Sequence, residues 1–405
     1  MAAPGLTGRN FARSDASTAS IPQHHGVSAL ADCPKNCGSF GHQGVQKSYQ
    51  QDRQDPSIEA AELNKDLRNR VHSNLFPILR HQIIIASRAL DPINLSGEPL
   101  STLQSILMIQ SQLDHTLNQF PSALQRIGRV MSTLRSGRTN DQYLKEFKYF
   151  RGGGLFYLYT SRVIKELVKL FKQSYRLIRQ MGLSFERNHD PTRIDATRQL
   201  ILEHTSSACK EIDSAIEWLE GSEFDLVQWD WPSEICNINE QLEDLMYLIN
   251  HASLDQADSK PTNELLNQRN MRLAKTIPPI VKLSRLYRGG GMNIKRLPFS
   301  TGMCSDQLES LGALAKKVRQ DLGSFLSVLT NAHTVEEAFT YNMLINTAET
   351  LFEHLNSALF LITLYVVPLV PDTIDSPVQN YFKTWFITWY NQFRLAIHQL
   401  EDASG

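Results

Sequence analysis

The segment between Cys33 and His42 brings together residue types that bind zinc. Cys33, Cys37 and His42 offer three ligands, whereas a tetrahedral zinc site needs four. Lys47 stands where a fourth cysteine would complete the set. We therefore interpret the two cysteines as free thiols in a polar tail, and we expect no metal site.

Two glycine triplets could present backbone amides to a phosphate group. They follow Arg151 and Arg288, whose guanidinium groups would add positive charge. Neither triplet is followed by the Gly-Lys-Ser/Thr sequence of a nucleotide-binding P-loop. Because glycine is common just past the end of a helix, we predict that both triplets lie in loops after helix ends. The alternative is an enzyme with a helical cavity that binds a phosphorylated substrate near Arg151 or Arg288.

Other enzyme signatures that suit a helical fold are missing from the sequence. A di-iron bundle needs two Glu-x-x-His pairs, and only Glu186 with His189 fits, beside a predicted loop. The sequence contains no His-Glu-x-x-His, Gly-x-Ser-x-Gly or Asp-Asp-x-x-Asp motif. We therefore predict a non-enzymatic protein without a cofactor.

A row of cations on one predicted helix is the most regular charged feature of the chain. Its members recur at alternating steps of three and four residues, which places their side chains on one face of a helix. They are Arg162, Lys165, Lys169, Lys172, Arg176 and Arg179. Because like charges at this spacing repel, the row is destabilising unless solvent or a negative neighbour compensates it.

That negative neighbour is either internal or external. An internal one would come from the acidic segment that follows, with the residues Glu211, Asp213, Glu217, Glu220 and Glu223. An external one would be an acidic protein partner, a nucleic acid or an anionic membrane surface. We favour protein among the external partners, since the formal net charge is −1 and no known nucleic-acid-binding module is present.

Charge is strongly segregated along the chain despite the near-zero total. Residues 126–187 carry a net charge of +10, residues 190–266 carry −13, and residues 267–300 carry +8. The last block adds a second basic helix, which spans Arg269 to Arg288. We predict that it binds acidic surfaces together with the first row, through Arg269, Arg272, Lys275, Lys282, Arg285 and Arg288.

These residues must be positioned by helices, because a period of 3.6 residues runs through nearly every segment after residue 56. We predict an all-α fold, a multi-helix bundle in two packed halves, with a disordered N-terminal tail over residues 1–55. The halves are residues 56–188 and 189–405, divided at the Asp190-Pro191 loop. The expected helices cover 57–90, 99–135, 141–150, 155–181, 193–221, 234–256, 262–288, 303–331, 334–367 and 377–402.

Cysteine usage and hydropathy indicate where such a protein works. Five cysteines, odd in number and mostly far apart, do not suit a disulfide framework and fit a reducing compartment. The apolar stretch Leu359–Val370 is shorter than the roughly twenty residues that a membrane-spanning helix needs. We expect no membrane span and a cytoplasmic or nuclear location, with a mitochondrial presequence as the less favoured alternative. The sequence does not define the oligomeric state.

Two segments resemble a known group of proteins. Ile212–Leu219 with Ser222-Glu223-Phe224, and Lys275–Tyr287, are similar to uncharacterised helical proteins that are expanded in plant-pathogenic rust fungi. The second segment also resembles the cyclin-D-interacting protein family. That resemblance implies an all-helical, non-enzymatic binding protein. Together with the charge pattern, it favours an intracellular module that binds acidic partner surfaces through basic amphipathic helices.

Overall fold

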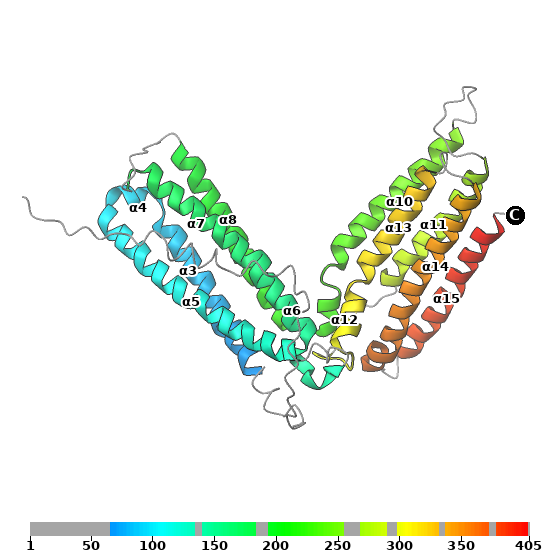
Figure 1. The fold of residues 1–405 in the computed structure, drawn as a ribbon, viewed down its shortest axis with the longest axis horizontal. Helices are drawn as coiled ribbons and strands as arrows, with labels where there is room; N and C mark the ends of the chain where they lie inside the picture. The colour runs from blue at the N-terminus through cyan, green and yellow to red at the C-terminus, as the bar shows by residue number, and fades with distance from the viewer. Residues whose placement is uncertain are drawn as a thin grey trace, which may run out of the picture. The chain divides into compact units, whose positions relative to one another are not determined.

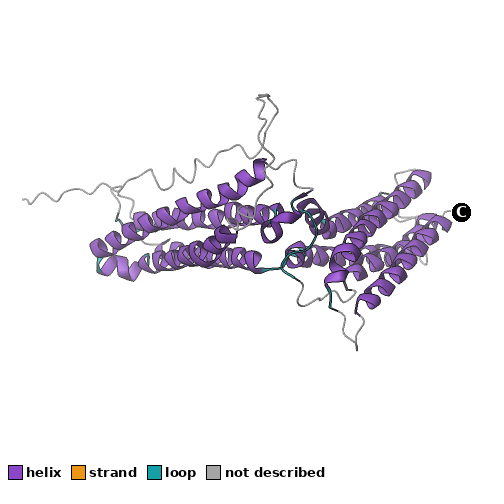
Figure 2. Cartoon of the chain, turned by 90° about the horizontal axis from the view of Figure 1, so that it is seen from below, coloured by secondary structure: helices purple, strands orange, loops and turns teal. Residues whose placement is uncertain are grey.

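The computed structural model describes residues 65–133, 140–183, 193–254, 268–289, 298–331, 337–371 and 378–403. Every regular element within these ranges is a helix, which confirms the predicted all-α fold (Figure 2). The predicted disordered tail, the Cys33–His42 segment and the Asp190-Pro191 loop lie outside the described residues.

Four long helices, α3, α5, α7 and α8, form the N-terminal bundle and lie side by side in Figure 1. Short π-helical turns directly precede two of them, α3 and α7. The elements are η1 (Val71–Leu75), α3 (Phe76–Ala89), α4 (Pro92–Gly97), α5 (Pro99–Thr133), η3 (Gln142–Phe147), α6 (Tyr149–Tyr157), η4 (Leu158–Val163), α7 (Ile164–Gln180) and α8 (Ile194–Glu220).

The C-terminal bundle is built from α10, α11, α13, α14 and α15, with two short helices before and between them (Figure 1). The elements are α9 (Glu223–Val227), α10 (Trp231–Leu254), α11 (Gln268–Gly289), α12 (Ser305–Gly312), α13 (Leu314–Thr330), α14 (Glu337–Leu361), η6 (Ile362–Val366), η7 (Val367–Leu369) and α15 (Val378–Asp402). Each predicted helix in this half therefore has a counterpart in the structure.

The aromatic residues of α15 show why these helices pack as a bundle. Phe382, Phe386, Trp389 and Phe393 recur every three or four residues, and each is less than 5% exposed. A stripe with this spacing must be covered by neighbouring helices, because burying an aromatic side chain contributes about 2–3 kcal/mol. Helices α11 and α14 provide that cover.

Two hydrophobic clusters divide the molecule at the end of α8. Helix α8 contributes Ile201, Ile212 and Leu219 to the cluster that also contains α3, α5 and α7. The second cluster includes α10 to α15, and α9 contributes Phe224 and Val227 to it but Leu226 to the first cluster. The predicted boundary at residues 188/189 assigned α8 to the C-terminal half, whereas its apolar face packs in the N-terminal bundle.

The first glycine triplet lies inside a helix, so the prediction of a loop there was wrong. Gly152, Gly153 and Gly154 are in the middle of α6, which continues through η4 into α7. Gly154 is needed within this helix because the Trp218 ring packs where a side chain on residue 154 would be. At the second triplet, α11 does end at Gly289.

One helical stretch, Ala338–Leu369, is long and apolar enough to cross a membrane by length and composition alone. In the structure, α14 packs between α13 and α15. The apolar run within it contributes Ile362, Val366 and Val367 to the C-terminal core. These three residues are fully buried.

Candidate functional site

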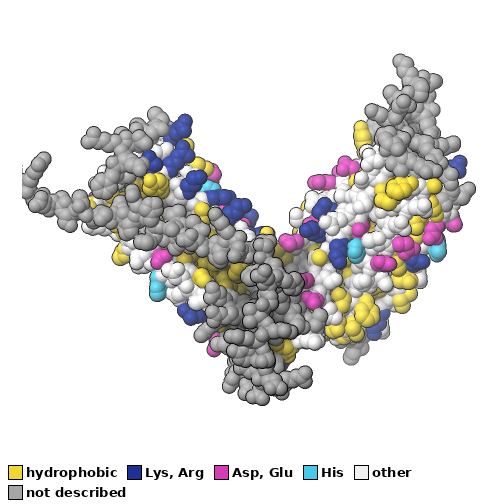
Figure 3. Space-filling model, viewed as in Figure 1, with side chains coloured by type: hydrophobic (Ala, Val, Ile, Leu, Met, Phe, Trp, Pro, Cys, Tyr) yellow, Lys and Arg dark blue, Asp and Glu magenta, His cyan; other side chains and the backbone are white. Residues whose placement is uncertain are grey.

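The basic row predicted between Arg162 and Arg179 lies along one side of η4 and α7. The opposite side of α7 is apolar, with Leu167, Leu170 and Leu177 no more than 1% exposed. This division follows from the 3.6-residue period, because the apolar stripe packs against α8 and turns the cations outward. Figure 3 shows Lys and Arg side chains gathered along this edge of the N-terminal bundle.

Two of the six cations lie close to acidic side chains of described residues. Arg162 lies 3.7 Å from the carboxylate of Glu211 on α8. Lys169 lies 2.7 Å from Glu166 on its own helix, and His204 Nδ1 lies 3.1 Å from the other oxygen of Glu166. Burial alone would raise the pKa of Glu166, but its hydrogen bonds with Lys169 and His204 lower this pKa below its usual value.

Two further contacts involve aromatic rings of the same face. The guanidinium carbon of Arg162 lies 6.0 Å from the centre of the Tyr157 ring. That of Arg179 lies 5.6 Å from the centre of the Tyr175 ring. These distances fit weak cation–π attraction, which orients the two arginines along the helix.

The outer edge of the row is a cationic stripe that we define as Lys165, Val168, Lys172, Tyr175 and Arg176. All five side chains are exposed, and those of Val168 and Tyr175 are 44% and 52% exposed. Lys165, Lys172 and Arg176 form no ion pair with another described residue. The stripe therefore combines three available positive charges with two apolar contact residues.

The internal alternative accounts for only a small part of the row. Of the acidic residues predicted as internal neighbours, Glu211 contacts a cation of the row, Arg162. Asp213 pairs with Arg80 of α3 at 3.0 Å, and Glu220 pairs with His72 at 2.8 Å. The acidic face of α8 thus stabilises packing against α3 and η1 more than it neutralises α7.

The second predicted surface lies on α11. Arg272, Lys275, Lys282 and Arg285 are exposed on one face, while the side chains of Arg269 and Arg288 lie outside the described residues. The opposite face of α11 is buried against α10 and α15. None of the four exposed cations forms an ion pair with another described residue. The structure therefore presents two separate cationic surfaces.

Sequence reasoning missed a buried ion pair between Lys148 and Glu223. Their side chains are 1% and 2% exposed, and Lys148 Nζ lies 2.8 Å from the Glu223 carboxylate. Lys148 also donates to the carbonyl oxygen of Thr301 at 2.7 Å, and Glu223 accepts from the Thr301 amide at 2.7 Å. A buried pair of this kind is tolerated only when such additional hydrogen bonds complete it.

Asp141 is a second buried group that the sequence did not reveal. Its two carboxylate oxygens accept hydrogen bonds from the amide of Tyr149 at 3.0 Å and the amide of Ser305 at 2.8 Å. These amides lie at the starts of α6 and α12, where a helix has no internal acceptors for them. One carboxylate therefore caps two helices that are far apart in the sequence.

Arg151 is also buried, at 1% exposed, and its contacts are with the protein itself. It donates to the carbonyl oxygens of Trp218 and Leu219 at 3.0 and 3.3 Å. Its guanidinium carbon lies 4.0 Å from the centre of the Phe299 ring, and that of Arg68 lies 4.2 Å from it. Arg151 therefore stabilises the C-terminal end of α8, in contrast to the exposed cations of α7.

No local signal in the sequence identifies these buried groups. Lys148 and Glu223 are 75 residues apart, and Asp141 and Ser305 are 164 residues apart. Within the part of the chain that the structure describes, no group of three or more His, Cys, Asp or Glu side chains could hold a metal ion. Glu186 and the side chain of Arg288 lie outside the part of the chain that the structure describes.

Comparison with known families divides the chain where the hydrophobic clusters divide it. Residues 64–220 match the family model described as domain of unknown function DUF8723. Residues 222–402 match the one described as domain of unknown function DUF8721. No curated protein and no solved structure matches the chain at a significant level. The chain is thus similar, along most of its length, to families to which no function is assigned.

Proposed function

We propose that this protein is a non-enzymatic interaction module that binds an acidic protein surface through the cationic stripe of α7. The observation that carries the proposal is the exposure of Lys165, Lys172 and Arg176 without an acidic partner among the described residues. A surface that holds like charges this close together pays a repulsive cost, which an acidic partner would relieve.

Exposed apolar side chains within the stripe support a protein partner. Val168 and Tyr175 lie between the cations and are about half exposed. Tyrosine provides a large contact area at a small loss of conformational entropy, so it is enriched in protein interfaces. The face suits an amphipathic helix or loop that presents carboxylates beside apolar residues.

The buried position of Arg151 disfavours the enzyme alternative, in which a phosphorylated substrate binds near this residue. Its guanidinium group donates to two backbone carbonyls and lies against Phe299, so it is engaged in packing. A nucleic acid or an anionic membrane would bind the same stripe of α7. The kind of molecule that the chain binds therefore distinguishes these alternatives from a protein partner.

The experiment is affinity capture from native cells, with identification of the bound proteins by mass spectrometry. The purified chain is also tested for binding to nucleic acid and to anionic vesicles. Lys165→Glu, Lys172→Glu and Arg176→Glu are combined in one variant. The matched control combines Arg88→Glu, Lys316→Glu and Lys383→Glu, which reverse three exposed cations on other helices. A third variant reverses Arg272, Lys275 and Lys282 of α11.

The proposal expects acidic proteins to bind the wild-type chain and the control, and to be lost from the α7 variant with its helical circular dichroism unchanged. Loss from the α11 variant as well would show that both cationic surfaces take part. Capture of the same proteins by the α7 variant would overturn the proposal. Recovery of nucleic acid, or binding to anionic vesicles only, would replace it with the corresponding alternative.

The proposal extends to the place of action, which we infer to be the cytoplasm or nucleus. Cys209, Cys236 and Cys304 are free thiols among the described residues, which suits a reducing compartment. The resemblance of Lys275–Tyr287 to the cyclin-D-interacting family supports a binding role of this kind. Fluorescence microscopy of the tagged chain in its native cell tests the location.

A further inference from the structure

Helix α10 presents an acidic face to solvent. Glu240, Glu243 and Asp244 are exposed, and Tyr247 beside them is 65% exposed. The three carboxylates form no ion pair with another described residue. The opposite face of α10 is buried through residues such as Leu245, so this acidic stripe, which we define as Glu240, Glu243, Asp244 and Tyr247, faces outward.

We propose that a second copy of this chain is an acidic partner of α7, and that its acidic stripe on α10 docks on the cationic stripe. The inference rests on the proposed function, because it names an occupant for the same surface. Its support is charge complementarity: three cations on one helix and three carboxylates on another, none of them paired with a described residue, and each set beside exposed apolar side chains.

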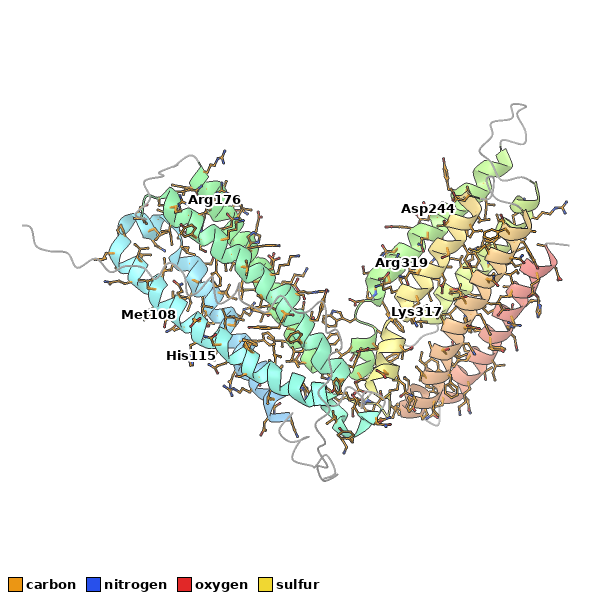
Figure 4. The ribbon with its side chains drawn as sticks, in the orientation of Figure 1. Met108, His115, Arg176, Asp244, Lys317 and Arg319 are labelled. Atoms are coloured by element: carbon orange, nitrogen blue, oxygen red, sulfur yellow. The ribbon has the colours of Figure 1, made fainter. Side chains whose placement is uncertain are left out.

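The spacing of the charges on the two helices also matches. Lys172 and Arg176 are four residues apart, as are Glu240 and Asp244, so each pair is separated by about 6 Å along its helix axis. Arg176 and Asp244 are labelled in Figure 4, one on α7 and the other on α10. Two helices with equal charge spacing can form both ion pairs at once.

An antiparallel alignment satisfies the apolar residues as well. If Lys172 lies opposite Asp244 and Arg176 lies opposite Glu240, then the helical rise places Val168 about 1.5 Å, one residue, from the level of Tyr247. Both of these side chains are exposed, at 44% and 65%. Docking therefore removes apolar surface from water together with the charges, which an isolated surface ion pair does not do.

A two-fold dimer would form this contact twice. Each copy carries both stripes, so α7 of each chain faces α10 of the other, as in an isologous interface. Four ion pairs, two in each contact, would then act together. The association is expected to weaken as salt screens the charges, because the Debye length falls from about 10 Å at 0.1 M to about 3 Å at 1 M.

The test measures the mass of the full chain in solution by sedimentation equilibrium, at low and at high salt. The cation-reversed variant carries Lys165→Glu, Lys172→Glu and Arg176→Glu. The acid-reversed variant carries Glu240→Lys, Glu243→Lys and Asp244→Lys. We expect the wild-type chain to be dimeric at low salt and each variant to be monomeric. The control with Arg88, Lys316 and Lys383 reversed should remain dimeric.

Mixing the two variants is the decisive arm. In the mixed dimer both contacts regain opposite charges, so an equimolar mixture is expected to dimerise although neither variant does so alone. This rescue also shows that both variants are folded. Failure of the mixture to associate would overturn the inference, as would a wild-type dimer that neither triple reversal disrupts.

Different results would contradict the proposed function and this inference. A wild-type chain that is monomeric at low salt, yet captures acidic proteins through α7, contradicts only the second copy as partner. A chain that dimerises through α7 and α10 but captures no other acidic protein confirms the inference and limits the proposed function to self-association.

Discussion

The indole ring of Trp218 in α8 occupies the space beside Gly154 in α6. A Cβ atom added to Gly154 would lie 2.0 Å from a carbon of this ring, far inside van der Waals contact. The ring is held in place because its Nε1 donates to the carbonyl oxygen of Arg151 at 2.9 Å. The close approach of α6 and α8 therefore requires glycine at this position.

We predict opposite effects for alanine at two adjacent glycines of α6. Gly154→Ala should lower the free energy of unfolding by at least about 1–3 kcal/mol, since the Trp218 ring must move. At Gly153, nothing lies within 4 Å of the added Cβ, so Gly153→Ala should raise it by about 0.5–1 kcal/mol through helix propensity. Urea denaturation followed by circular dichroism measures both. Equal stability of the two variants would show that α6 and α8 do not approach this closely.

The buried pair of Lys148 and Glu223 leads to a prediction about a single and a double variant. Lys148→Met leaves the Glu223 carboxylate without its cation and should cost about 3–5 kcal/mol. Adding Glu223→Gln removes the uncompensated charge and keeps an acceptor for Thr301. The double variant should therefore unfold at a higher urea concentration than Lys148→Met alone. If adding Glu223→Gln lowers the stability further, other contacts already compensate the Glu223 carboxylate in Lys148→Met.

Replacing Asp141 should destabilise the protein by about as much as the loss of two helix caps. Asp141→Ala removes the acceptors of the Tyr149 and Ser305 amides, and each lost cap costs about 0.5–2 kcal/mol. Ser222→Ala is the matched control, because Ser222 caps α9 alone. Thermal unfolding should show a larger decrease for Asp141→Ala. A decrease no larger than that of the control would show that only one of the two caps stabilises the protein.

Helical periodicity was sufficient to predict the cationic face of α7. The alternating steps from Arg162 to Arg179 fixed which side chains share a face, and Leu167 and Leu170 fixed which face is buried. These relations are local, because they act within a few turns of one helix. The exposure of Lys165, Lys172 and Arg176 follows from the same pattern.

The buried groups could not be predicted in this way. Glu223 is one of seventeen acidic residues in its charge block, and its sequence neighbours do not distinguish it from those at the surface. Gly154 was expected to lie past a helix end because glycine is common there, whereas it lies within α6, where the Trp218 ring leaves no room for a side chain. In both cases the deciding contact comes from another element, more than 60 residues away.

The contacts of Glu166 predict a specific pH dependence. Burial acts to raise its pKa, but the hydrogen bonds with Lys169 and His204 hold the pKa below the usual 4.5. The unfolded chain therefore binds a proton at this carboxylate at a higher pH than the folded chain does. The ionised group stabilises the fold fully above about pH 4.5, and this contribution is lost as the pH falls through the folded-state pKa.

Glu166→Gln tests this directly. The variant should be less stable than the wild type at pH 7, and the difference should shrink as the pH is lowered below about 4.5, because the wild-type carboxylate then becomes neutral as well. Urea denaturation at a series of pH values measures the difference. Glu353→Gln removes an exposed carboxylate with the same change in net charge, so it separates this effect from general charge repulsion. A difference between wild type and Glu166→Gln that stays constant down to acidic pH would mean that Lys169 and His204 do not stabilise the ionised form.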